Sequence, residues 1–154
     1  MKIFFGTETG NAELVAEDIA TELSERGFQV ECIDMANVEV EALCQEVFFI
    51  VVCSSYGDGE LPHSAQPLFA ALEEKSPDLT GCSFASFGLG DSFYETFNAG
   101  VKIIEDKLIS LGATMIGTRG VHDASEGTIP TDQAIAWVEQ ELSPLLNLKE
   151  AAQG

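Results

Sequence analysis

The chain has 154 residues, of which 45% are hydrophobic, so it contains enough apolar side chain to bury the core of one domain. Seven Lys and Arg residues stand against 26 Asp and Glu residues, and the formal net charge is −19 at pH 7. Such a charge repels phosphate backbones and anionic lipid, which makes nucleic acid and membrane surfaces poor partners. No apolar run approaches the roughly 20 residues of a membrane span, and no signal-peptide pattern precedes Lys2, so we expect a soluble, cytoplasmic protein.

The cysteines are widely spaced, with no C-x-x-C pair and no clustered histidines, and they therefore predict neither a metal site nor a redox dithiol. We expect reduced core residues at Cys32, Cys44, Cys53 and Cys82.

Apolar segments alternate between strand-like runs and helical spacing along the whole chain, with no repeat and no linker. The predicted strands are 2–5, 28–34, 47–53, 83–87 and 114–116, the last with a continuation near Val121. The first predicted helix has its apolar face between Ala12 and Leu23 and ends at Gly27. The other predicted helices are 38–44, 65–72, 101–111 and 131–146.

Residues 47–53 are apolar on both faces, as central parallel strands are. The alternation predicts a single α/β domain over residues 1–154, a doubly wound parallel sheet of five strands with helices on both faces. We expect residues 147–154 to form a loosely ordered tail.

In an open parallel sheet, ligands bind beyond the carboxyl ends of the strands. Three loops predicted at that edge are glycine-rich, long or chemically unusual: 6–11, 54–62 and 88–98. The first combines Thr7, Thr9 and Asn11 with glycines directly before a helix, where backbone N–H groups favour an anion. It contains no Lys or Arg, so a phosphate there would be held by neutral donors. The same residue types also form an ordinary capped turn, and this alternative stays open.

The sequence has two tyrosines, Tyr56 and Tyr94, and both fall in the second and third of these loops. Two flat rings on neighbouring loops can enclose a planar aromatic ligand, with Phe97 one helical turn further on as part of the wall. For either tyrosine alone, packing over its own loop is the more common arrangement, but both together, beside the anion loop, favour a phosphorylated planar ligand.

These residues resemble the flavodoxin family. The segment G-T-E-T-G-N-A at 6–12 is similar to the flavodoxin phosphate loop, and 53–60 and 87–98 are similar to the two flavin loops. The resemblance covers nearly the whole chain and is of the short-chain type; MioC-type flavodoxins and the FMN domains of diflavin reductases are similar as well. It implies a flavodoxin-like fold with strand order 2-1-3-4-5.

The resemblance further implies bound FMN and a low-potential one-electron carrier that uses the flavin semiquinone/hydroquinone couple, without substrate turnover of its own. Glu8 is expected to contribute its backbone amide, and Tyr56 replaces the family's usual stacking tryptophan, while Trp137 is expected in the core. The expected cofactor-binding residues are Thr7, Glu8, Thr9, Gly10, Asn11, Ala12, Ser54, Ser55, Tyr56, Gly57, Asp58, Gly59, Leu89, Gly90, Asp91, Tyr94, Phe97 and Asn98.

The acidic composition suggests how such a carrier would behave. Acids around the proposed flavin edge would disfavour an anionic reduced flavin. These acids are Asp58, Glu60, Asp91, Glu95 and Asp123. They would also favour transient binding of redox partners with a basic surface, namely a donor reductase and an acceptor enzyme. We expect the carrier itself to be a monomer. His63 and His122 fall in predicted loops at the same edge, where we expect ordinary exposed histidines.

Other proteins of this fold class fit less well. A phosphoacceptor response regulator, a P-loop enzyme and a small tyrosine phosphatase each need residues that this chain lacks at the corresponding places. An FMN-binding accessory module of the MioC type, which supports another enzyme, remains as the alternative to the electron carrier.

Overall fold

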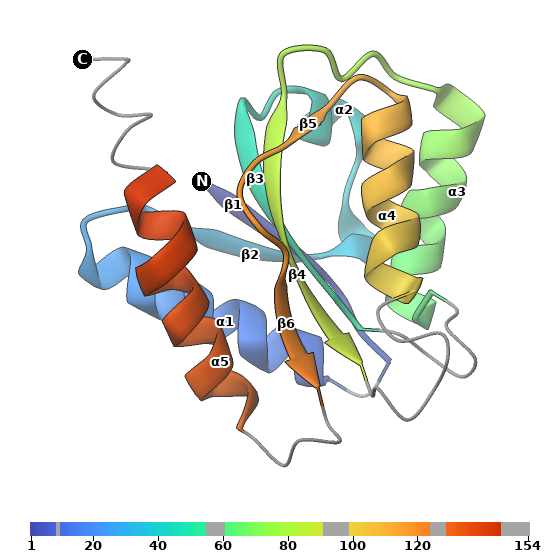
Figure 1. The fold of residues 1–154 in the computed structure, drawn as a ribbon. Coiled ribbons are helices and arrows are strands. Elements are labelled where there is room, and N and C mark those ends of the chain that lie inside the picture. The colour runs from blue at the N-terminus through green and yellow to red at the C-terminus, as the bar shows by residue number, and fades with distance from the viewer. Residues whose placement is uncertain (9, 55–60, 91–98, 124–128, 146–154) are drawn as a thin grey trace.

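The computed structural model describes residues 1–8, 10–54, 61–90, 99–123 and 129–145. Its centre is a parallel sheet with the strand order β2-β1-β3-β4-β5, in which a further strand, β6, also pairs with β4 (Figure 1). The strands are β1 (Lys2–Gly6), β2 (Glu31–Asp34), β3 (Phe48–Ser54), β4 (Ser83–Gly90), β5 (Thr114–Met115) and β6 (Gly120–Asp123). The predicted fold class and strand order are confirmed.

Helices cover both faces of this sheet (Figure 1). They are α1 (Asn11–Glu25), α2 (Val40–Cys44), α3 (Gln66–Lys75), α4 (Ala99–Ser110) and α5 (Pro130–Trp137), with 3-10 turns at Met35–Asn37 and His63–Ala65. The predicted last helix, 131–146, is longer than α5. The difference arises because a π-helical turn at Val138–Leu142 interrupts the regular α-helical winding after Trp137.

The core has two halves, one on each face of the sheet. Along β3 every side chain before Ser54 is buried, and successive residues alternate between the halves, which confirms the prediction of a central strand. On the α1 and α5 side, β3 contributes Phe48, Ile50 and Val52. On the α2, α3 and α4 side, Phe49 packs against Phe4 and Phe84, with ring centroids 5.5 and 5.8 Å away.

The last strand of the sheet is broken into two pieces, both paired with β4. Between them Gly117 adopts a φ of 72°, which takes the chain out of the sheet for a few residues. The chain rejoins the sheet at Gly120, which lies so close to the core that a Cβ on this residue would be 2.7 Å from Trp137 Cγ. Trp137 is buried, as expected, and its indole Nε1 donates to the Thr118 carbonyl at 2.9 Å.

A buried ion pair anchors this break to α4. The Glu105 carboxylate, 3% exposed, accepts from Ser86 Oγ on β4 and from both the Nε and the Nη2 of Arg119, the Nε at 2.7 Å. A two-pronged pairing of this kind satisfies the buried carboxylate and fixes Arg119 just before β6.

All four cysteines are free thiols. Cys53 and Cys82 are buried, as expected of core residues, whereas Cys32 and Cys44 are only partly buried. Burial raises the pKa of Cys53 to about 12 and that of Cys32 to about 11. Within the described ranges, no helix has the length and apolar character to cross a membrane.

Arg119→Met should destabilise the protein by about 3 kcal/mol, because it leaves the Glu105 carboxylate buried without its cation. Urea unfolding followed by circular dichroism measures the change. Lys75→Met, which breaks an exposed pair with Glu41, is the control and should leave the unfolding midpoint nearly unchanged. The double variant Arg119→Met, Glu105→Leu should recover much of the loss; equal loss in the single and double variants would contradict this account.

Candidate functional site

The carboxyl ends of four strands meet at one edge of the sheet. The register pairs Gly6 of β1 with Cys53 of β3, Ser54 with Leu89 of β4, and Gly90 with Asp123 of β6. The loops predicted to carry a ligand all leave the sheet from these ends. Of their residues, the structure describes most of the first loop, both ends of the second and only the beginning of the third, 88–90.

The loop between β1 and α1 starts and ends with a glycine that the geometry requires. A Cβ on Gly6 would lie 2.8 Å from Ala65 Cβ and 2.9 Å from Met35 Sδ, so only glycine fits there. Gly10, the residue before α1, has a φ of 95°, in the left-handed region that favours glycine. Its N–H donates to Thr7 Oγ1 at 2.8 Å, which closes the loop into a compact turn.

Three backbone N–H groups of this loop, those of Glu8, Asn11 and Ala12, make no hydrogen bond within the described part of the chain. Ala12 is 0% exposed, so its N–H is buried as well as unpaired there. Within the described residues, the first bond of α1 runs from Leu14 N–H to the Gly10 carbonyl, and Gly10 has no side chain that could cap the N–H groups of the first helical turn. Unpaired donors at the positive end of a helix dipole fit a phosphate group.

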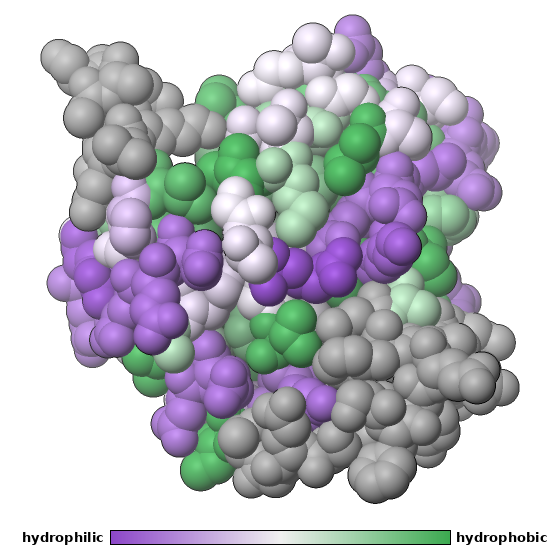
Figure 2. Space-filling view, in the orientation of Figure 1, coloured by the Kyte–Doolittle hydropathy of each residue, from purple (hydrophilic) through white to green (hydrophobic). Residues whose placement is uncertain are grey.

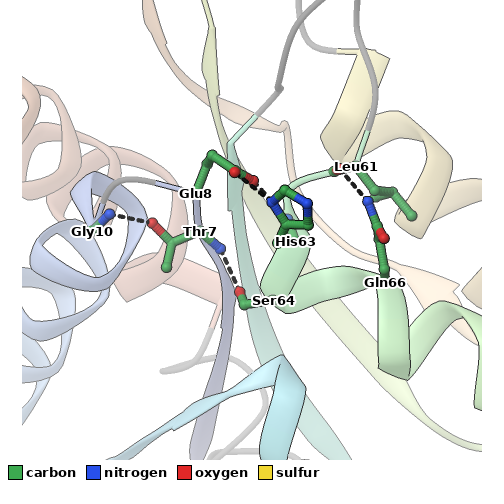
Figure 3. Close-up of polar contacts among 7 residues, drawn as sticks. All are labelled: Thr7, Glu8, Gly10, Leu61, His63, Ser64 and Gln66. Atoms are coloured by element: carbon green, nitrogen blue, oxygen red, sulfur yellow. Dashed lines mark hydrogen bonds and ion pairs between the residues drawn. The ribbon is translucent and has the colours of Figure 1, made fainter.

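A second loop segment supports the first (Figure 3). Thr7 and Ser64 exchange hydrogen bonds: Thr7 N–H donates to Ser64 Oγ at 2.7 Å, and Ser64 N–H donates to the Thr7 carbonyl at 3.4 Å. Glu8 Oε2 accepts from the His63 N–H at 2.8 Å, and Glu8 Oε1 lies 2.5 Å from His63 Nδ1. These contacts join the loop after β1 to the 3-10 turn His63–Ala65, which directly precedes α3.

The contact of the Glu8 carboxylate with His63 goes beyond the expectation for this residue, because the resemblance implies only a role for its backbone amide. The hydrogen bond from the His63 backbone N–H, together with the His63 ring, holds the pKa of the Glu8 carboxyl below its ordinary value. No sequence pattern indicates this pairing, since the two residues are 55 positions apart. The amide role of Glu8 stays a prediction.

The two histidines differ from each other. His63 has an exposed side chain, as expected, but it is bonded to Glu8 as described above. For His122 the expected exposed loop position is wrong, since this residue belongs to β6, is 7% exposed and lies opposite Leu89. Burial alternates along its strand, but the sequence G-V-H-D has no apolar–polar alternation that matches it, so no local signal indicates the buried position of His122.

Of the other predicted site residues, Ser54 and Gly90 are the last residues of β3 and β4, at the edge of the sheet where the candidate site lies. Leu89 is buried in the core half that packs on α1 and α5. The remainder lie outside the described residues: Thr9, Ser55, Tyr56, Gly57, Asp58, Gly59, Asp91, Tyr94, Phe97 and Asn98.

Fold and candidate site together define a doubly wound α/β protein whose loop after the first strand presents N–H groups without a partner among the described residues, at the edge where such sheets bind ligands. A family model described as flavodoxin matches residues 3–137. The flavodoxin YqcA of Pectobacterium carotovorum is 38% identical over 137 residues, which are 89% of this chain and 91% of that protein. The protein MioC of Escherichia coli strain K12 is 32% identical over 133 residues, 86% of this chain and 89% of that protein.

Among solved structures, a cysteine-to-serine mutant of the flavodoxin from Pseudomonas aeruginosa superposes with a TM-score of 0.80 at 33% identity. The match covers 91% of this chain and 95% of that one. The chain therefore belongs to the flavodoxin family, whose members are FMN-binding electron-transfer proteins.

Gly10→Ala should destabilise the protein by about 1–2 kcal/mol, because a Cβ at this left-handed position clashes with the adjacent carbonyl. Gly10→Asn is the matched control, since asparagine tolerates this conformation better, and it should cost less. Urea unfolding of both variants without ligand tests the difference. Equal destabilisation by Ala and Asn would show that the conformation of Gly10 is not the cause.

Proposed function

We propose that this chain carries single electrons between redox proteins on an FMN whose phosphate binds in the loop between β1 and α1. The observation that carries the proposal is the set of N–H groups at the start of α1, above all the buried one of Ala12. A phosphate oxygen would supply the acceptor that these donors lack among the described residues. Family membership supports the same ligand.

The phosphate would be held without a cation. Residues 6–12 contain no Lys or Arg, so the backbone N–H groups of Glu8, Asn11 and Ala12 would act together with the hydroxyl of Thr9. Ser54, Gly90 and the two tyrosine-bearing loops would surround the ring system, with Tyr56 and Tyr94 on its faces. FMN supplies the redox chemistry when bound, because its ring system takes up and releases electrons one at a time. The chain's part is to bind it, orient it and exclude water.

The charge of the chain indicates the kind of partner. With a net charge of −19, the surface favours a basic redox protein that docks briefly on a small interface. Hydrophilic side chains gather over α4 and over the α1 and α5 side of the molecule, as Figure 2 shows. We propose a monomeric, cytoplasmic carrier that has no substrate turnover of its own.

The similarity to MioC favours a second candidate, in which the chain is an FMN-binding accessory module that supports another enzyme. The two candidates differ in the rate at which the reduced protein passes electrons to an acceptor. Fast reduction of cytochrome c favours the carrier, and slow reduction by a fully FMN-loaded protein favours the module.

The apoprotein should bind FMN about tenfold to a hundredfold more tightly than riboflavin, because charge-assisted hydrogen bonds to the phosphate contribute about 1.5–3 kcal/mol. Quenching of flavin fluorescence during titration measures both affinities, and inorganic phosphate should compete with FMN only. Failure of the apoprotein to bind FMN would contradict the proposed function. Equal affinity for the two flavins would contradict the proposed place of the phosphate.

Electron transfer from the reduced protein to basic cytochrome c should slow as salt rises from about 0.05 to about 0.5 M, because ions screen the attraction between the two proteins. Stopped-flow absorbance measures the rate. Cytochrome c with acetylated lysines, which lack the positive charge, is the control and should react slowly at every salt concentration. A rate that salt does not change would rule out electrostatic steering.

A further inference from the structure

The contacts of residues 7 and 8 with residues 63 and 64 connect two loops that otherwise leave the sheet separately. They consist of two hydrogen bonds between Thr7 and Ser64 and two contacts between Glu8 and His63, in the region that Figure 3 shows. We call this set the loop clasp. Its two partners on the first loop lie between Gly6, which the core admits only as glycine, and Gly10, which starts α1.

Glu8 is an unexpected residue beside a phosphate site, since a free carboxylate would repel a phosphate dianion. In the structure its side chain is largely covered, 19% exposed, and both of its oxygens contact His63. The contact is with the main-chain N–H as well as with the ring, so the carboxylate acts as a fixed hydrogen-bond acceptor at the start of the 3-10 turn His63–Ala65.

We infer that Glu8 is a positioning residue for the phosphate-binding loop: its carboxylate, held by His63, fixes the main chain at position 8 so that the neighbouring N–H groups face the phosphate. The inference rests on the proposed function and deepens it. Thr7 is fixed from the other side by Ser64, and Gly10 by Thr7 Oγ1. Three points of the loop are therefore set before any ligand arrives.

Preorganisation of this kind raises affinity by reducing the ordering that binding requires. Its effect should fall mainly on the phosphate, because Thr7 and Glu8 belong to the loop after β1, whereas His63 and Ser64 follow the second loop and belong to the 3-10 turn before α3. Loss of the clasp should therefore weaken the binding of FMN and leave the binding of riboflavin, which has no phosphate, nearly as it was. A general loss of stability would weaken both.

The test compares Glu8→Ala with Glu8→Gln. Both variants remove the same negative charge, but the glutamine carbonyl can still accept from the His63 N–H, whereas alanine cannot. The ratio of their FMN affinities therefore isolates the hydrogen bond from the charge. We expect Glu8→Ala to bind FMN about tenfold more weakly than Glu8→Gln, with equal riboflavin affinities, by fluorescence titration.

Ser64 offers an independent arm of the same test, which also serves if Glu8→Ala fails to fold. Ser64→Ala removes the acceptor for the Thr7 N–H, and Ser64→Thr keeps it. We expect the alanine variant to bind FMN several-fold more weakly than the threonine variant. Glu74→Gln, a change of equal charge on the exposed surface of α3, is the control and should match the wild-type protein.

The outcomes separate the two levels of inference. If the wild-type protein does not bind FMN, the proposed function fails, and the inference with it. If the wild-type protein binds FMN but Glu8→Ala binds it as tightly as Glu8→Gln, only the positioning role of Glu8 is overturned. A parallel loss of riboflavin affinity in Glu8→Ala also overturns it, since the effect would then lie in the fold and not in the phosphate loop.

Discussion

A backbone N–H that is buried without an acceptor destabilises a fold by about 1–3 kcal/mol, and among the described residues the buried N–H of Ala12, in the first turn of α1, has no acceptor. The side chain of Ala12 is needed in the core between α1 and the sheet, so the residue cannot move outward to reach water. Glycine before the helix excludes the usual capping side chain. The packing of α1 and the geometry of the turn thus leave N–H donors that have no acceptor among the described residues, and an anion of the kind proposed above would satisfy them.

Much of this arrangement can be predicted from local sequence. The alternation of strands and helices, the central position of residues 48–54 and the glycine-rich turn before α1 follow from hydrophobic periodicity and from the conformations that glycine permits. These features depend on residues that are neighbours along the chain. Trp137 could be assigned to the core for the same reason, since it shares a helical face with Ala134.

Features that depend on distant pairs could not be predicted in this way. Glu8 and His63 are each ordinary residues in their own segments, and their pairing arises only when β1 and the chain after β3 lie side by side. The same holds for Glu105 and Arg119, whose pairing explains why the last strand can break and still return to β4. His122 was misplaced because a four-residue strand after such a break gives too short a pattern to be separated from a loop.

The use of main-chain donors at α1 has a consequence for how such a site tolerates sequence change. A peptide N–H is present in every residue except proline, so the groups that would contact the phosphate are nearly immune to substitution. Selection can then act only on what shapes the backbone: the two glycines, the buried Ala12 and the partners in the loop clasp. Across divergent sequences, the N–H groups that would contact the phosphate would stay the same while the supporting side chains changed. A scan of single substitutions would therefore lower ligand affinity through residues that shape the loop, and not through loss of the N–H groups that would touch the phosphate.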